Sequence, residues 1–154
     1  MNSTSMNDAG SGMSRAYTTK QMGDACEMLV AAELTLAGIP ALEVPDLWPG
    51  YDVVAQPIGR EPQRISVKSR TFKKGAAFVE YKATDVFDWL AICILPAGEV
   101  TTRTIYIVPR DLADTKARKD KETSKTALLR YWRIDEVERV FGPYRDNFTL
   151  MRDL

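Results

Sequence analysis

The sequence contains no histidine. This absence excludes serine–histidine–aspartate triads, cysteine–histidine pairs and histidine-ligated metal sites, and it leaves carboxylates and lysines as the groups available for catalysis. Cysteine is scarce, because the chain has only Cys26 and Cys93, which stand in apolar surroundings without a CxxC spacing. We therefore expect two buried, reduced thiols, which are typical of a cytoplasmic protein.

Long apolar runs are also lacking, and the N-terminus has no signal-peptide core. These absences predict a soluble, cytoplasmic protein with no membrane partner.

Net charge is absent as well, since 21 basic residues balance 21 acidic ones. The distribution is uneven, however, with two basic and seven acidic residues in 1–57 but seven basic and two acidic in 58–82. Such a local excess indicates an anionic partner or a solvated basic face.

The 154 residues are sufficient for one domain with a hydrophobic core. Residues 1–16 are rich in serine, asparagine, glycine and methionine, so we expect a disordered leader there and a single domain over 17–154. Helical spacing of apolar residues predicts a first helix that begins near Thr18 or Thr19, with Thr19 as the N-cap, and ends at Gly38.

Residues 50–70 predict two adjacent strands joined by a turn that contains proline and glycine. Asp52 opens the first strand and Lys68 lies near the end of the second. Strict alternation along the second strand places Ser66 and Lys68 on one face and their apolar neighbours on the other. If the strands pair, an acid and a base meet in one pocket, which can hold a divalent cation and a hydrolytic water.

Further extended segments are expected at 39–44, 77–81 and 102–108, together with a strand buried on both faces at 89–95. Residues 110–133 are expected to be helical or loop-like, with a short helix near 135–140. The fold class is therefore α/β, with a central sheet. We interpret the three tryptophans, Trp48, Trp89 and Trp132, as packing residues rather than base-stacking platforms.

Taken together, these segments resemble the PD-(D/E)xK nuclease superfamily, and in particular its small restriction-endonuclease-like and Holliday-resolvase-like members. The matching motifs are Gly-x-x-x-Glu on the first helix (ending at Glu27), Gly-Tyr-Asp at a strand start (ending at Asp52) and Ile-Ser-Val-Lys at a strand end (ending at Lys68). The resemblance covers residues 22–110. It implies a single domain with a central mixed β-sheet flanked by helices.

The resemblance also implies roles for particular residues. Asp52 corresponds to the metal-binding aspartate, Lys68 to the lysine that positions or activates the attacking water, and Glu27 to a helix glutamate that many members add to the site. The backbone carbonyl of Val67 would be a further metal ligand. The implied cofactor is Mg²⁺ or Mn²⁺, the implied partner is DNA, and a homodimer is left open.

A cluster of three basic residues follows the second strand directly: Arg70, Lys73 and Lys74. Cations placed there can hold the phosphate backbone of a substrate. Arg110, after the strand ending at Pro109, is either a surface residue or another phosphate contact, and Asp88 is expected to cap the turn before the buried strand.

One position departs from the family pattern. Two residues before the lysine the family has Glu, Asp or Gln, whereas this sequence has Ser66. A neutral, short hydroxyl should lower metal affinity unless Glu27 or Glu80 compensates. Two functions therefore remain: a metal-dependent DNA endonuclease that hydrolyses phosphodiester bonds, or a catalytically impaired nuclease-fold module that binds nucleic acid or a protein partner.

A second, literal ExK motif occurs at Glu80 and Lys82. It lies in a segment with weaker strand character, so we rank it behind Lys68. Pro45 and Asp46 form a literal PD, but Trp48 and Pro49 follow it instead of an apolar strand, and a loop is the better interpretation.

Overall fold

The computed structural model describes residues 15–154, so almost all of the leader expected at 1–16 lies outside the described residues. Helix α1 (Thr19–Leu36) is capped by Thr18. The Thr18 hydroxyl accepts the Gln21 N–H at 3.1 Å, and the Gln21 side chain accepts the Thr18 N–H at 2.9 Å. This reciprocal capping box requires a Gln or Glu three residues after the cap, so the expectation that Thr19 is the N-cap was wrong by one residue.

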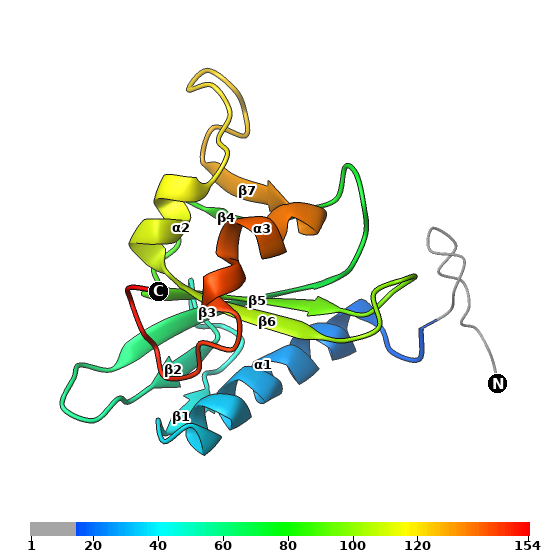
Figure 1. Ribbon diagram of the computed structural model, residues 1–154. Coiled ribbons are helices and arrows are strands. Elements are labelled where there is room, and N and C mark those ends of the chain that lie inside the picture. Colours follow the sequence, from blue (N-terminus) through cyan, green and yellow to red (C-terminus); the bar gives the residue numbers. More distant parts are fainter. Residues whose placement is uncertain (1–14) are drawn as a thin grey trace.

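A mixed five-stranded sheet forms the centre of the molecule (Figure 1). Its order is β1 (Ala41–Glu43), β2 (Val53–Ala55), β3 (Gln63–Thr71), β5 (Trp89–Leu95) and β6 (Thr104–Pro109). Strands β3 and β5 are parallel, and the other neighbours are antiparallel. The expected hairpin over residues 50–70 is therefore present as β2 and β3.

Helix α1 covers one face of this sheet (Figure 1). Its apolar stripe, which includes Cys26, Val30 and Leu34, packs against Val53 and Ile65 in a first core cluster. The spacing of these helix residues matches the helical repeat, which explains why one face is buried. Cys26 and Cys93 are both buried and unbridged, as expected.

The opposite face carries a second layer (Figure 1). It contains α2 (Arg110–Lys116), α3 (Val137–Phe141), the 3₁₀ turns η3 (Ile134–Glu136) and η4 (Gly142–Tyr144), and a two-stranded antiparallel ribbon of β4 (Phe78–Lys82) and β7 (Leu129–Arg133). Strand β5 lies between the two layers, and its side chains alternate between the two core clusters. The prediction of a strand buried on both faces is confirmed.

Strand β7 was not expected, because 110–133 was interpreted as helical or loop-like. That interpretation is correct for α2 and wrong for residues 129–133. The strand is specified by non-local pairing with β4 and by burial of Trp132 against the second core cluster, and neither is visible in the local sequence pattern.

Two of the three tryptophans pack as expected, since Trp89 and Trp132 are 0% and 1% exposed. Trp48 is 48% exposed, so its interpretation as a packing residue was wrong. It lies in the loop between β1 and β2, where its ring meets the Tyr51 ring edge to face. Within residues 15–154, no helix is long and apolar enough to cross a bilayer.

Candidate active site

Asp52 lies directly before β2, at the point where the pairing of β2 with β3 ends. The register pairs Val53 with Ile65, so one further step brings Asp52 opposite Ser66, on the face that also carries Lys68. The Asp52 N–H still donates to the Ile65 carbonyl at 2.9 Å. Its carboxylate Oδ2 accepts the Val67 N–H at 2.7 Å. This bond fixes the carboxylate, and its second oxygen makes no hydrogen bond within residues 15–154.

The main chain of Val67 faces the edge that β2 has vacated. In an antiparallel pair, the N–H and C=O of one residue point to the same side of the strand. Because the Val67 N–H reaches Asp52, its carbonyl oxygen points to the same edge. The carbonyl expected as a metal ligand therefore lies on the side of β3 where the Asp52 carboxylate is held.

Lys68 is half-buried on β3 and acts electrostatically on Asp52. Burial raises the pKa of Asp52 above its ordinary value, and the Val67 N–H and the Lys68 ammonium offset that rise only in part. An acid and a base from neighbouring strands thus share one environment.

Glu27 approaches from α1 and is half-buried. Its pKa is raised to about 7, first by burial and then by the negative charge of Asp52, with smaller effects of Glu43 and Asp24. The structure therefore brings Glu27 and Asp52 into one electrostatic site. A bound cation would relieve the repulsion by which Asp52 disfavours the ionisation of Glu27.

The oxygen atoms of Glu27, Asp52 and the Val67 carbonyl are the possible metal ligands of this site. Within residues 15–154, no group of three or more acidic or cysteine side chains is arranged around one point. Mg²⁺ commonly takes only one or two protein carboxylates and completes its shell with waters and substrate phosphates. Glu27, Asp52 and the Val67 carbonyl are hard oxygen donors of this kind, so the donor set fits a Mg²⁺ or Mn²⁺ site that substrate completes.

Ser66 is 3% exposed. It lies on the same face as Lys68, where the family pattern places an acidic residue or glutamine. A carboxylate buried to this degree is unfavourable unless it is paired or bound to a cation. The serine therefore leaves the site with two carboxylates.

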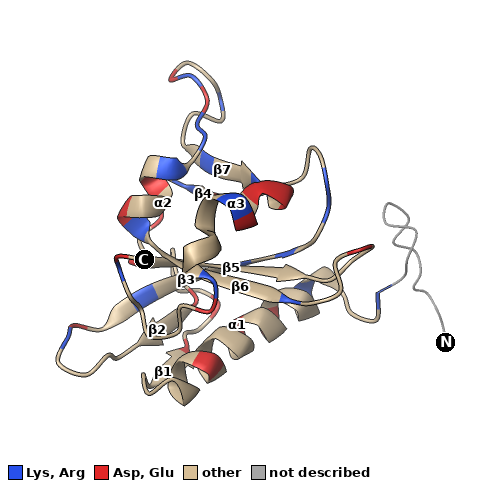
Figure 2. Ribbon diagram, viewed as in Figure 1, with Lys and Arg blue, Asp and Glu red and all other residues tan. Residues whose placement is uncertain are grey.

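The three basic residues expected to contact DNA have different surroundings. Arg70 donates from Nε to the Phe78 carbonyl at 3.0 Å and from Nη1 to the Ser69 carbonyl at 2.8 Å, so it holds the connection between β3 and β4. Lys73 and Lys74 are exposed in that connection, and Figure 2 shows basic residues in blue on this loop.

The literal ExK motif is separated from Asp52. Glu80 and Lys82 lie on β4, which pairs with β7 in a second sheet. The intervening Tyr81 points into the second core cluster, so Glu80 and Lys82 point away from it. Glu80 acts electrostatically on Arg70.

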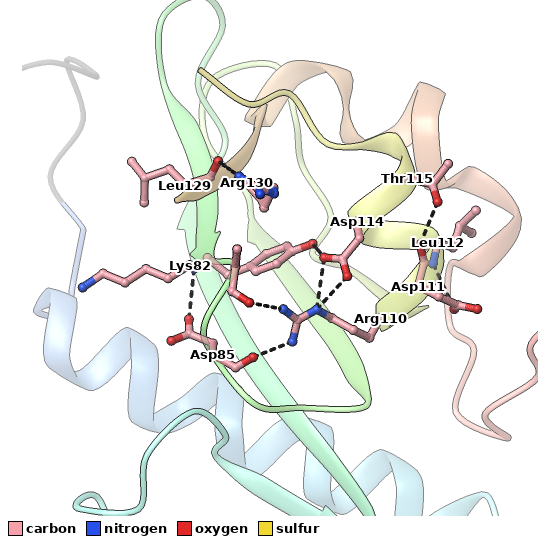
Figure 3. Close-up of polar contacts among 11 residues, drawn as sticks. Lys82, Asp85, Arg110, Asp111, Leu112, Asp114, Thr115, Leu129 and Arg130 are labelled. Atoms are coloured by element: carbon pink, nitrogen blue, oxygen red, sulfur yellow. Dashed lines mark hydrogen bonds and ion pairs between the residues drawn. The ribbon is translucent and has the colours of Figure 1, made fainter. Parts of the chain in front are cut away.

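The loop between β4 and β5 brings Asp85 towards Asp52. Asp85 contributes to the raised pKa of Asp52, and its Oδ2 accepts the Lys82 N–H at 3.0 Å. Sequence reasoning missed Asp85, because its approach to Asp52 depends on strand order. Arg110 binds the same loop (Figure 3), which makes it a structural residue rather than a free phosphate contact.

Asp88 makes a stronger contact than the turn cap expected of it. Its carboxylate accepts the Arg64 main-chain N–H at 2.8 Å and two bonds of the Arg64 guanidinium, both at 3.1 Å. This contact lowers the pKa of Asp88 and ties the start of β3 to the start of β5.

No protein-family model matches the sequence, and no curated protein matches it. Among solved structures, the chain is similar to I-Ssp6803I, a bacterial homing endonuclease, with a TM-score of 0.56 and 22% identity over 86% of this chain and 90% of that chain. It also matches Hjc, a Holliday junction resolvase from the archaeal hyperthermophile Archaeoglobus fulgidus, with a TM-score of 0.47 and 16% identity over 75% and 91% of the two chains. The sheet order confirms the α/β fold with a central mixed sheet flanked by helices, and the first similarity shows that this homing endonuclease has a similar fold.

Proposed function

We propose that the protein is a divalent-metal-dependent DNA endonuclease that hydrolyses phosphodiester bonds. The observation that carries this proposal is the Asp52 carboxylate, which is held by the Val67 N–H and interacts electrostatically with Lys68 and Glu27. The fold shared with a homing endonuclease supports it.

In this proposal Glu27, Asp52 and the Val67 carbonyl hold Mg²⁺ or Mn²⁺. The ion, when bound, supplies charge neutralisation on the phosphate and a more acidic water. The hydrogen bond from Val67 keeps one oxygen of Asp52 oriented, so the other is free for the ion. Lys68 donates a hydrogen bond that positions the attacking water, and its charge favours the developing negative charge on the phosphate.

The basic loop completes the substrate site. Lys73 and Lys74 are exposed and follow β3 directly, so they can neutralise phosphates of the DNA strand on either side of the reacting bond. Such contacts position DNA without reading its sequence.

The test is cleavage of plasmid, branched and single-stranded DNA with Mg²⁺ or Mn²⁺. We expect Lys68→Ala and Asp52→Asn to reduce the rate by about 100-fold or more. Lys82→Ala, which removes an exposed lysine of the second ExK motif, is the matched control and should keep the rate. Absence of cleavage on every DNA form with both metals would overturn the proposal.

Ser66 supports a second candidate function, a nuclease-fold module that binds nucleic acid or a protein partner without cleaving. A site with two carboxylates holds a cation more weakly than one with three. This alternative predicts DNA binding that weakens with salt, persists in EDTA and survives Asp52→Ala.

A further inference from the structure

A pocket of about 360 Å³ opens beside the candidate active site, between the loop that precedes β2 and the loop that precedes β5. It is lined by Trp48, Pro49, Gly50, Tyr51, Thr84, Asp85 and Val86. Its volume falls within the range of small-molecule sites, roughly 300–1,000 Å³. The Trp48 and Tyr51 rings meet edge to face, with centroids 5.9 Å apart.

The two loops are in direct backbone contact. Gly50 has a φ of +89°, and a Cβ on it would lie 2.8 Å from the Val86 nitrogen and 2.9 Å from the Val86 oxygen. Only glycine fits this close approach, because any side chain would collide with main-chain atoms. The close approach of the two pocket loops therefore depends on Gly50.

The second loop is held from behind by Arg110 (Figure 3). Its guanidinium donates to the Asp85 carbonyl at 2.6 Å and to the Ala83 carbonyl at 3.0 Å. The same group lies 4.2 Å from the centroid of the Phe87 ring. These contacts fix the wall that carries Asp85, so the pocket is pre-formed rather than dependent on loop closure.

The open side of this pocket is apolar. Trp48 and Val86 are 48% and 52% exposed, whereas the other two tryptophans are buried. An exposed aromatic ring on a rigid pocket is typical of a ligand site.

We infer that this pocket binds an unpaired nucleobase of the DNA strand whose phosphate occupies the candidate active site. The inference rests on the proposed function for its substrate. Tyr51 lines the pocket and directly precedes Asp52 in the chain, so adjacent residues contribute to the pocket and to the candidate active site. A nucleotide can place its phosphate at Asp52 and a neighbouring base against Trp48.

The lining chemistry favours a base over a phosphate. Asp85 would repel an anion inside the pocket, and no basic side chain lines it. Asp85 Oδ1 makes no hydrogen bond within residues 15–154, so it can accept an N–H from the edge of a base. Stacking on an aromatic ring is available to every base, which is how single-stranded sites tolerate sequence variation.

The experiment uses the full chain carrying Lys68→Ala with Mg²⁺ present, so that binding is measured with metal available and with little cleavage. The probe is a DNA duplex with one unpaired fluorescent adenine analogue, compared with the same duplex carrying an abasic site at that position. We expect quenching of the analogue on binding, and at least about five-fold weaker binding of the abasic duplex.

Three variants refine the test. Trp48→Ala should abolish the quenching and weaken binding to the level of the abasic duplex, while Trp48→Phe should retain both. Leu47→Ala is the matched control, because Leu47 is 93% exposed and does not line the pocket. Equal affinity for the two duplexes, or identical behaviour of Trp48→Ala and Leu47→Ala, would overturn the inference.

Cleavage assays separate this inference from the proposed function. Cleavage that requires Asp52 and Lys68 but ignores Trp48 would overturn the pocket and keep the endonuclease. Quenching that requires Trp48 in a protein that never cleaves DNA would support the pocket and overturn the endonuclease.

Discussion

Asp52 and Val67 are joined across the end of β2 by a hydrogen bond of 2.7 Å from the Val67 N–H to the Asp52 carboxylate. The bond replaces the ladder contact that a longer β2 would make. It therefore fixes a carboxylate at the end of the strand pair, on the side of β3 to which the Val67 carbonyl points. Glu27 and Lys68 approach the same carboxylate from α1 and β3.

The raised pKa of Glu27 predicts a pH-dependent stability. Its pKa rises from an ordinary value of 4.5 to about 7, so between these values the folded state binds more protons than the unfolded state. Stability in the absence of metal should therefore fall as pH rises from 4.5 to about 7. Glu27→Gln cannot ionise, so its melting temperature should exceed that of the parent protein above pH 7 and approach it below pH 4.5.

Thermal melts in EDTA across this pH range measure the effect. Glu33→Gln, on the same helix, is the matched control for replacing a glutamate by glutamine. A parent protein whose stability is flat between pH 4.5 and 7 would contradict the assignment of Glu27.

Metal binding should stabilise the fold through the same groups. A cation that binds only the folded state stabilises it by about 2.7 kcal/mol at 100 times its Kd. Mg²⁺ should therefore raise the melting temperature of the parent protein by several degrees, and Asp52→Asn should lose most of that shift. The comparison is made at constant ionic strength with NaCl. An equal shift in both proteins would place the ion elsewhere.

Local patterns predicted the parts of this fold that depend on nearby residues. Alternation along residues 65–68 predicted which face carries Ser66 and Lys68, and turn residues predicted the hairpin of β2 and β3. Strand β7 and the approach of Asp85 were missed because both depend on pairings between distant segments. Glu27 could be named only through the resemblance, since nothing in its own helix indicates that Asp52 lies nearby.

The pocket beside Trp48 also depends on contacts between distant segments, which local sequence patterns do not predict. Residues 45–51 and 83–88 meet because β2, β3 and β5 are neighbours in the sheet, an order that the sequence does not reveal. Trp48 was therefore interpreted by its residue type, as a packing residue, although its loop leaves it half exposed.

Arg110 should contribute to stability rather than to DNA affinity. Its side chain satisfies two main-chain carbonyls and pairs with Asp114. Arg110→Ala leaves those carbonyls without their donor, and we expect a loss of about 2–3 kcal/mol in the free energy of unfolding. Arg110→Lys should lose somewhat less, because lysine keeps the charge but not the planar fork.

Urea unfolding measures this loss. Arg139→Ala is the control, because the Arg139 side chain is 74% exposed and Glu136 keeps Arg118 as its partner in this variant. Equal losses in the Arg110 and Arg139 variants would contradict the structural role of Arg110.

Replacing Ser66 by an acidic residue should lower the free energy of unfolding and raise the affinity for a divalent cation. The position is 3% exposed and opposite Asp52, so a carboxylate there adds a third acid to Glu27 and Asp52. Without metal, Ser66→Asp should lower the free energy of unfolding by about 1–3 kcal/mol, because the new charge is buried and repelled. With Mg²⁺ or Mn²⁺ much of this loss should be recovered, since three carboxylates bind the ion more tightly.

The paired readout for Ser66→Asp is the Mn²⁺ concentration that gives half-maximal cleavage or half-maximal thermal shift, which should fall by about ten-fold or more. Ser66→Ala is the control for size and burial, and it should leave this concentration unchanged. If Ser66→Asp is destabilised equally with and without metal, a side chain at position 66 does not bind the ion. Serine at this position would then be a packing residue of the sheet, and the cation would be held by Glu27 and Asp52 alone.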